Sequence, residues 1–168
     1  MISRFLLATS LLFVAAGAVF AQTPFSGEMQ CTPPSPSYSV DIPDTDGHSA
    51  ILQQTTCNWT QQVQIGPTKT AQSVATLSAD VMPTKLTGNG VNVITMGNGD
   101  RVVIVFHTVI AASNKLPQSA EGTFTITGGT GQMSGITGKG TFTGLFNTDG
   151  SATYRLQGEF VLPKPAGQ

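Results

Sequence analysis

Charged side chains are scarce in this chain, at 10% of its 168 residues. Beyond residue 21 the cations stand singly along the sequence, as Lys69, Lys85, Arg101, Lys115, Lys139, Arg155 and Lys164. Sequence-independent binding to nucleic acid, and binding to an anionic membrane, both require a patch or stripe of basic residues on the protein surface. The sequence therefore predicts no nucleic-acid partner and no electrostatic attachment to a membrane.

Long hydrophobic runs are lacking too, except at the very start of the chain. Residues 1–21, MISRFLLATSLLFVAAGAVFA, place an arginine at position 4 before an apolar run and end on small residues. This layout is typical of a secretory signal peptide cleaved before Gln22. An uncleaved anchor is the alternative, but the run is marginal for a bilayer span of about 20 residues. We expect a secreted or periplasmic protein with no membrane span after cleavage.

Cysteine occurs only twice, as Cys31 and Cys57, both in the part predicted to be exported. In an oxidising compartment an isolated pair is most simply a disulfide. A metal or redox site is the alternative, but the chain has no C-x-x-C spacing, and His48 is the only histidine nearby. We expect a disulfide, no metal and no cofactor.

Amphipathic helical periodicity is missing after the leader, whereas Thr, Gly, Val and Ser are abundant. The sequence predicts an all-β domain. Residues 22–47 contain the proline- and aspartate-rich CTPPSPSYSVDIPDTDG and are expected to form an irregular arm. Residues 48–163 are expected to form the β-domain and residues 164–168 a tail.

Three stretches show how the β-domain is expected to be organised. VNVITM and RVVIVFHTVI flank the turn sequence GNGD, a pattern typical of a hairpin. A further turn is expected at NTDG, residues 147–150, before the last strand. Residues 73–82, SVATLSADVM, fit a helix or a strand, and we favour the strand because Pro83 follows directly and the neighbouring segments are strand-like.

The most distinctive stretch is TITGGTGQMSGITGKGTFTG, residues 125–144. A dinucleotide fingerprint starting at Gly129 and Gly131 would need glycine where Ser134 stands, and a P-loop would need Ser or Thr after Lys139, where Gly140 stands. Glycines inside strand-like sequence are typical of bulges and sharp bends, which a small closed barrel needs. We interpret the run as shaping a sheet.

The same stretch resembles the glycine-rich hairpin of allene oxide cyclase and dirigent-like, or calycin-like, barrels and of small secreted bacterial proteins that share it. The matching positions are Phe124, Ile126, Gly128, Gly129, Thr130, Gly131, Met133, Gly135, Ile136, Gly138, Gly140 and Phe142. The resemblance implies a closed or nearly closed eight-stranded antiparallel barrel with an apolar lumen. No catalytic residue of those enzymes matches a motif position here.

The apolar parity of the last strands predicts which side chains line the lumen. These are Phe124, Ile126, Phe142, Phe146, Tyr154, Leu156 and Phe160. Gly144 and Gly158 share that parity, so we expect open room beside them. The polar Arg155, Gln157 and Glu159 are expected to face solvent.

Other candidate sites are weaker. Asp41, Asp44, Asp46 and His48 lie in DIPDTDGH, where DTDG resembles half of a calcium loop, but the closing glutamate is missing. Turn-forming aspartates are the favoured interpretation. His107 lies among valines and isoleucines with no nucleophile or carboxylate at a motif spacing, and we favour a structural role for it.

Three classes of function follow, in order of preference. The first is a secreted barrel that binds a small apolar ligand. The second is a cofactor-free cyclase or dirigent-like activity in the lumen, and the third is a structural or interaction protein of the cell envelope. The sequence favours binding over enzymatic activity and indicates no oligomeric state.

Overall fold

The computed structural model describes residues 22–113 and 116–163, and all but one of the elements in them are β-strands. The exception is the short 3-10 turn η1, Gly131–Met133. The strands are β1 Thr23–Cys31, β2 Ser37–Asp41, β3 Ser49–Gln61, β4 Gln64–Ile65, β5 Thr68–Met82, β6 Lys85–Met96, β7 Arg101–Ser113, β8 Leu116–Gly129, β9 Thr137–Phe146 and β10 Ala152–Val161. The predicted all-β class is confirmed.

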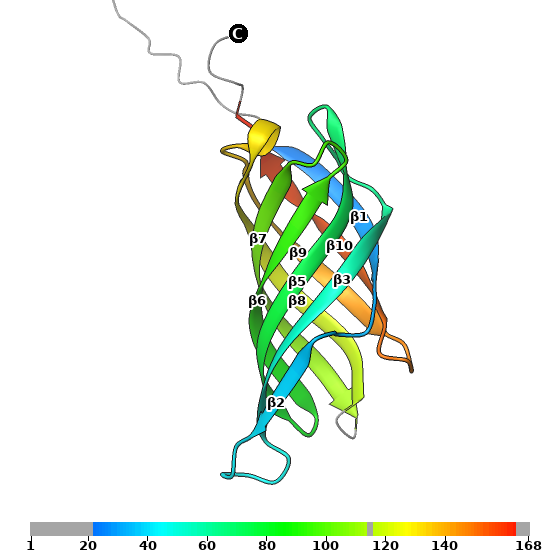
Figure 1. The fold of residues 1–168 in the computed structure, drawn as a ribbon, viewed down its shortest axis with the longest axis vertical. Helices are drawn as coiled ribbons and strands as arrows, with labels where there is room; N and C mark the ends of the chain where they lie inside the picture. Colours follow the sequence, from blue (N-terminus) through cyan, green and yellow to red (C-terminus); the bar gives the residue numbers. More distant parts are fainter. Residues whose placement is uncertain (1–21, 114–115, 164–168) are drawn as a thin grey trace, which may run out of the picture.

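Eight of these strands close into an antiparallel barrel (Figure 1). The order around the ring is β3, β1, β10, β9, β8, β7, β6 and β5, and β5 pairs back onto β3. The short β2 pairs with the beginning of β3, and β4 pairs with the beginning of β5. The eight-stranded barrel expected from the glycine-rich stretch is therefore present.

The expected irregular arm over residues 22–47 needs correction, because residues 23–31 form a full barrel strand. In β1, Phe25, Gly27, Met29 and Cys31 alternate with polar residues, and nine register pairs join the strand to β10. Two of the four inward-facing positions of β1 are Gly27 and Cys31. The segment therefore lacks the clear alternation of hydrophobic and polar residues that predicts a strand. β1 contains a single proline, Pro24, near its start, and the run of prolines at positions 33, 34 and 36 begins only after Cys31. Proline lacks the N–H group that a ladder needs.

The other local expectations hold. Residues 73–82 lie in β5, and the GNGD turn joins β6 to β7. At the turn between β9 and β10, the Asn147 N–H donates to the Ser151 carbonyl at 2.8 Å and the Gly150 N–H donates to the Asn147 carbonyl at 3.0 Å. Arg155 and Gln157 are exposed on β10, as expected for its outer face.

The glycine-rich stretch does more than turn the chain, because it also closes one end of the barrel. Between β8 and β9 the chain makes η1, and Gly131 and Gly135 adopt φ values of +55° and +75° that favour glycine. This connection lies at the upper end of the barrel in Figure 1, and its Met133 and Ile136 are both 0% exposed and belong to the core. The upper end of the barrel is therefore filled.

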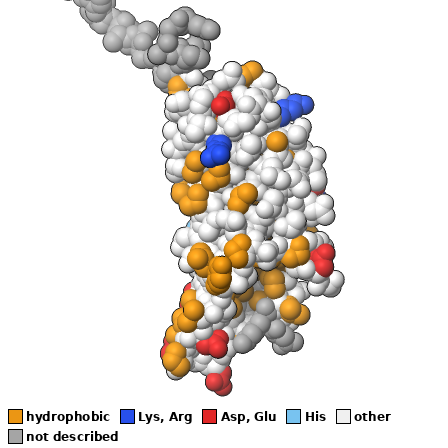
Figure 2. All heavy atoms as spheres, viewed as in Figure 1, with side chains coloured by type: hydrophobic (Ala, Val, Ile, Leu, Met, Phe, Trp, Pro, Cys, Tyr) orange, Lys and Arg blue, Asp and Glu red, His pale blue; other side chains and the backbone are white. Residues whose placement is uncertain are grey.

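The outer surface carries few charges on the face drawn in Figure 2, where apolar side chains are spread from the upper part to the lower end. Among the exposed apolar residues are Tyr38 and Val40 of β2 and Leu52 of β3. No helix within residues 22–113 and 116–163 is long and apolar enough to cross a membrane.

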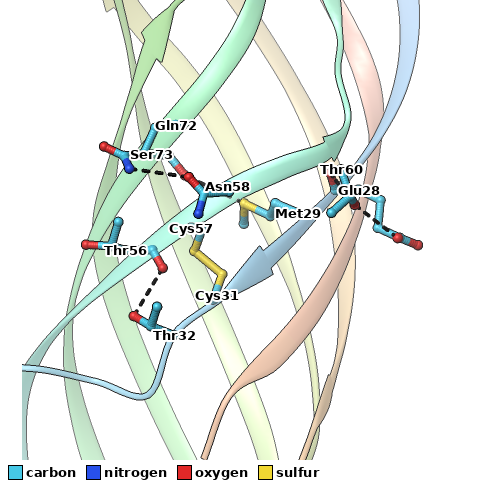
Figure 3. The surroundings of a disulfide bond; sticks show 10 residues. All are labelled: Glu28, Met29, Cys31, Thr32, Thr56, Cys57, Asn58, Thr60, Gln72 and Ser73. Carbon is cyan, nitrogen blue, oxygen red and sulfur yellow. Dashed lines mark hydrogen bonds between the residues drawn. A yellow bond between two sulfur atoms is a disulfide. The ribbon is translucent and has the colours of Figure 1, made fainter.

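The seam between β1 and β3 is the shortest in the ring. It has four register pairs and a bulge beside Glu28, whereas the seam between β8 and β9 has eight pairs. The predicted disulfide is present and joins its last pair, Cys31 and Cys57, with 4.0 Å between the Cα atoms (Figure 3). Directly after it, the Thr32 N–H donates to the Thr56 carbonyl at 2.9 Å. The covalent bond thus holds the seam where ladder pairing ends.

We predict that the double variant Cys31→Ala/Cys57→Ala is less stable by about 3–4 kcal/mol, because a loop of 26 residues is no longer closed in the unfolded chain. The free energy of unfolding should be measured by urea titration. Hydrogen exchange should show the loss of protection first in β1 and β3. Equal loss of protection over the whole barrel would contradict a special role of this seam.

The His48 side chain connects the loop between β2 and β3 to the end of β5 through two hydrogen bonds, an arrangement that we call the His48 clasp. Its Nδ1 lies 2.6 Å from Asp44 Oδ1 and its Nε2 lies 2.6 Å from Asp80 Oδ1. Both ring nitrogens can donate together only in the imidazolium form. The hydrogen bond to Asp80 and then the one to Asp44 raise the pKa of His48 above its usual value. The aspartates of DIPDTDGH are therefore partly explained by this clasp.

This clasp predicts a pH dependence of stability. Because the pKa of His48 is raised on folding, its contribution is complete below the ordinary histidine pKa of about 6.5 and is lost as pH rises through the higher folded value. The melting temperature of the wild type should therefore fall between pH 6 and pH 9 by more than that of His48→Gln. The Asp80→Asn variant should show a smaller fall than the wild type. Identical pH profiles for all three proteins would contradict the clasp.

Candidate functional site

The interior of the barrel is built from aromatic side chains that lie opposite glycines. An eight-stranded barrel has an interior just wide enough for side chains, so two bulky residues cannot face each other at every level. In four of the five register pairs given next, the ring occupies the space beside the glycine, whereas the backbone of β9 occupies the space beside Gly158. The register pairs are Phe25 with Gly158, Phe106 with Gly90, Phe124 with Gly140, Phe142 with Gly122 and Tyr154 with Gly144.

The rings touch one another edge to face rather than filling the centre completely. Phe142 lies 6.0 Å from Phe106 and 6.0 Å from Tyr154 between ring centroids, and Tyr154 lies 6.2 Å from Phe146. The interplanar angles of these pairs are 86°, 67° and 82°. Such T-shaped contacts are a favourable arrangement of aromatic pairs.

A cavity of about 90 Å³ lies along this aromatic interior. Its lining includes Asn92 and Ile104 toward the filled end of the barrel, and Ile110 and Phe146 toward the other end. Ile104 and Ile110 are separated by six positions along β7, which corresponds to about 20 Å of strand. The lining also includes both cysteines of the disulfide.

The rim of the cavity lies where β1 stops pairing with β3. After Cys31 the chain leaves the barrel wall, and residues 49–53 of β3 pair with β2 instead of β1. The exposed Thr32 and the half-buried Pro34, Gln53 and Gly150 line this rim. The early end of β1 therefore gives the cavity its opening.

All seven residues predicted for the lumen lie in the interior. Phe124, Ile126, Leu156 and Phe160 are buried in the core cluster, and Phe142 and Tyr154 pack against it. Phe146 packs against the second cluster, nearer the open end. Of the seven, Ile126 and Phe160 belong to the filled part, and the other five line the cavity.

The expected room beside Gly144 and Gly158 is not there. A Cβ atom on Gly144 would lie 2.5 Å from the Tyr154 ring, and one on Gly158 would lie 2.4 Å from the Lys139 carbonyl oxygen. The alternation of side chains along a strand correctly predicted that both glycine positions face the interior. It could not show that the Tyr154 ring takes the space beside Gly144 and that the backbone of β9 takes the space beside Gly158. The cavity is lined instead by residues from all eight strands of the barrel.

Sequence reasoning missed the polar residues of the lining, above all Asn92. This residue sits in VNVITM at the parity of Ile94 and Met96, so one polar side chain on a buried face was the available signal. Asn92 is 5% exposed, and its Oδ1 atom is buried without a hydrogen-bond partner. Thr108 also lines the cavity, and its hydroxyl donates to the Glu121 carbonyl at 3.1 Å.

The lining carries no charged side chain among the residues that the structure describes, and Tyr154 is its only titratable group. Burial raises the pKa of Tyr154 to about 12, so its hydroxyl stays protonated at neutral pH. Within the same described ranges, no group of three or more His, Cys, Asp or Glu side chains is placed to hold a metal ion. The arrangement can hold a neutral apolar molecule.

His107 lies outside this site. It is exposed on the outer wall, and its Nδ1 lies 3.0 Å from Asn89 Oδ1.

Comparisons with known proteins show only a similarity in structure. No family model and no curated protein matches the chain. A pterocarpan synthase dirigent protein, GePTS1, is similar at 15% identity and a TM-score of 0.43, over 93% of this chain and 100% of that one.

The close contacts beside Gly144 and Gly158 lead to a prediction about the stability of the barrel. We expect Gly158→Ala to destabilise the barrel by about 1–3 kcal/mol, because the new methyl group would press on the backbone of β9. Gly97→Ala is the matched control, since its Cβ would meet atoms only at 3.5 Å. Urea unfolding of both variants gives the comparison. If Gly158→Ala were as stable as Gly97→Ala, the close approach of the strands would be refuted.

Proposed function

We propose that this protein binds a small, neutral, apolar molecule in the lumen of its barrel. The observation that carries the proposal is the cavity itself, which is lined by aromatic and aliphatic side chains, closed at one end and open at the other. Ligand sites are typically concave and mostly apolar, with a few polar groups. The mouth of a β-barrel is a common place for them.

The volume limits the size of the ligand. Sites for drug-sized ligands usually measure about 300–1,000 Å³, and an engineered cavity of about 150 Å³ binds benzene. At about 90 Å³, this cavity is smaller than that one, so it suits a short chain, or a single small ring of which a part extends into the open rim. A long fatty acid would require displacement of the aromatic side chains. We therefore narrow the ligand class from apolar molecules in general to small ones.

As part of the proposal, the protein acts outside the cytoplasm. The disulfide is consistent with an oxidising compartment. The expected signal peptide lies in residues 1–21, outside the described residues.

The exposed apolar side chains of β2 and β3 favour the envelope interaction protein as a second candidate. Tyr38 and Val40 are 63% and 69% exposed, on a strand that has an unpaired edge within the described part of the chain. Edge strands of this kind can pair with another chain. Cyclase or dirigent-like activity gains no support, since the lining offers no carboxylate, imidazole or amine to move a proton.

The binding proposal predicts that toluene and phenol raise the melting temperature of the wild type. A ligand at 100 times its Kd adds about 2.7 kcal/mol of stability, or about 5–11 °C for a domain of this size. The Ala75→Leu variant should lose this shift, because Ala75 lines the cavity and a larger side chain fills it. Ala111→Leu, on the exposed face of β7, should retain it.

Isothermal titration calorimetry of the same three proteins should give a Kd in roughly the millimolar to micromolar range for the wild type, as expected for so few ligand atoms. Native mass spectrometry of protein exported by its own host would show whether a ligand is carried. If no small apolar probe binds the wild type, the binding proposal fails and the interaction protein becomes the first candidate.

A further inference from the structure

Asn92 is the one polar side chain of the described lining that is both deeply buried and left with an unpaired atom. Among the other buried polar residues, Thr70 accepts a hydrogen bond from the Val63 N–H at 3.0 Å, and Ser73 donates to Met29 Sδ at 3.7 Å. Thr108 donates to a backbone carbonyl. Within the described residues, Asn92 Oδ1 and Trp59 Nε1 are the two buried side-chain polar atoms without a hydrogen-bond partner, and of these two residues only Asn92 lines the cavity.

An unpaired buried carbonyl oxygen destabilises a fold, because the group loses its hydrogen bonds to water and gains nothing in return. The register partners of Asn92 are Ala75 and Ile104, both of which line the cavity beside it. Neither side chain can donate a hydrogen bond. The barrel alone offers Asn92 no partner, whereas a molecule in the cavity can reach it.

The chemistry of a carboxamide sets the kind of group that fits. By rotating about χ2 it presents either its oxygen, which accepts, or its NH₂ group, which donates. A hydroxyl group both donates and accepts, so it matches Asn92 in either orientation. A carboxylate does not fit, because no cation lines the cavity to compensate a buried negative charge.

We propose that Asn92 is the polar anchor of the lumen and that the ligand is a small uncharged molecule with one hydroxyl group at its buried end, such as a phenol or a short alcohol. This inference rests on the proposed binding function and adds the ligand's polarity and orientation to it. The apolar part of the ligand lies along Phe106, Phe142 and Tyr154, toward the rim.

The test uses phenol, toluene and benzoate, which share one ring and differ in a single group. Kd values are measured by calorimetry for the wild type, Asn92→Leu and Trp59→Phe. Leucine resembles asparagine in size but cannot form hydrogen bonds. Trp59→Phe is the matched control, because Trp59 Nε1 is also buried without a partner but does not line the cavity.

We expect Asn92→Leu to lower the preference for phenol over toluene about tenfold, the effect of losing one buried hydrogen bond. Trp59→Phe should leave that preference unchanged, and benzoate should not bind any of the three proteins. The ligand-free Asn92→Leu protein should melt at least as high as the wild type, because it no longer buries an unpaired polar group. A purely structural Asn92 would instead give a lower melting temperature.

The outcomes separate the anchor from the binding function. If toluene and phenol both bind and Asn92→Leu leaves their ratio unchanged, the anchor is overturned while the binding function stands. Tight binding of benzoate would also overturn the anchor. If neither toluene nor phenol binds the wild type, the binding function fails and the anchor fails with it.

Discussion

The structure depends on one packing constraint, which is that a large ring inside a narrow barrel needs a residue without a side chain opposite it. An eight-stranded barrel allows little interior width, and this chain fills it with aromatic residues. Most of the interior rings therefore pair with a glycine on the neighbouring strand, as Phe142 pairs with Gly122. The glycines bring strands close and allow them to bend, and each ring buries a large apolar area.

The interior is not completely filled. Its rings meet edge to face beside the cavity, buried aliphatic residues such as Leu77, Val81 and Ile110 pack near the open end, and others pack at the upper end. There the glycine-rich connection inserts Met133 and Ile136 and closes the core. At the other end β1 stops at Cys31, and its seam with β3 is held by a disulfide rather than by further ladder pairs.

A cavity formed in this way acquires its chemistry from a few side chains. Its wall is uncharged, and its tyrosine remains protonated at neutral pH. Asn92 places an unpaired amide oxygen near the closed end of the cavity, and aromatic rings line the part toward the opening. An uncharged wall with a single buried amide suits recognition of a neutral molecule better than proton transfer.

The sequence by itself determined the all-β class, the hairpins around GNGD and NTDG, the disulfide pair and the seven inward-facing residues. These features follow from local rules, namely the alternation of side chains along a strand, the preferences of turn residues and the small number of cysteines. Only the tertiary structure decided which strands are neighbours, and hence that Tyr154 occupies the room beside Gly144. It also made residues 23–31 a barrel strand and left Asn92 without a partner, because both depend on contacts between residues far apart in the chain.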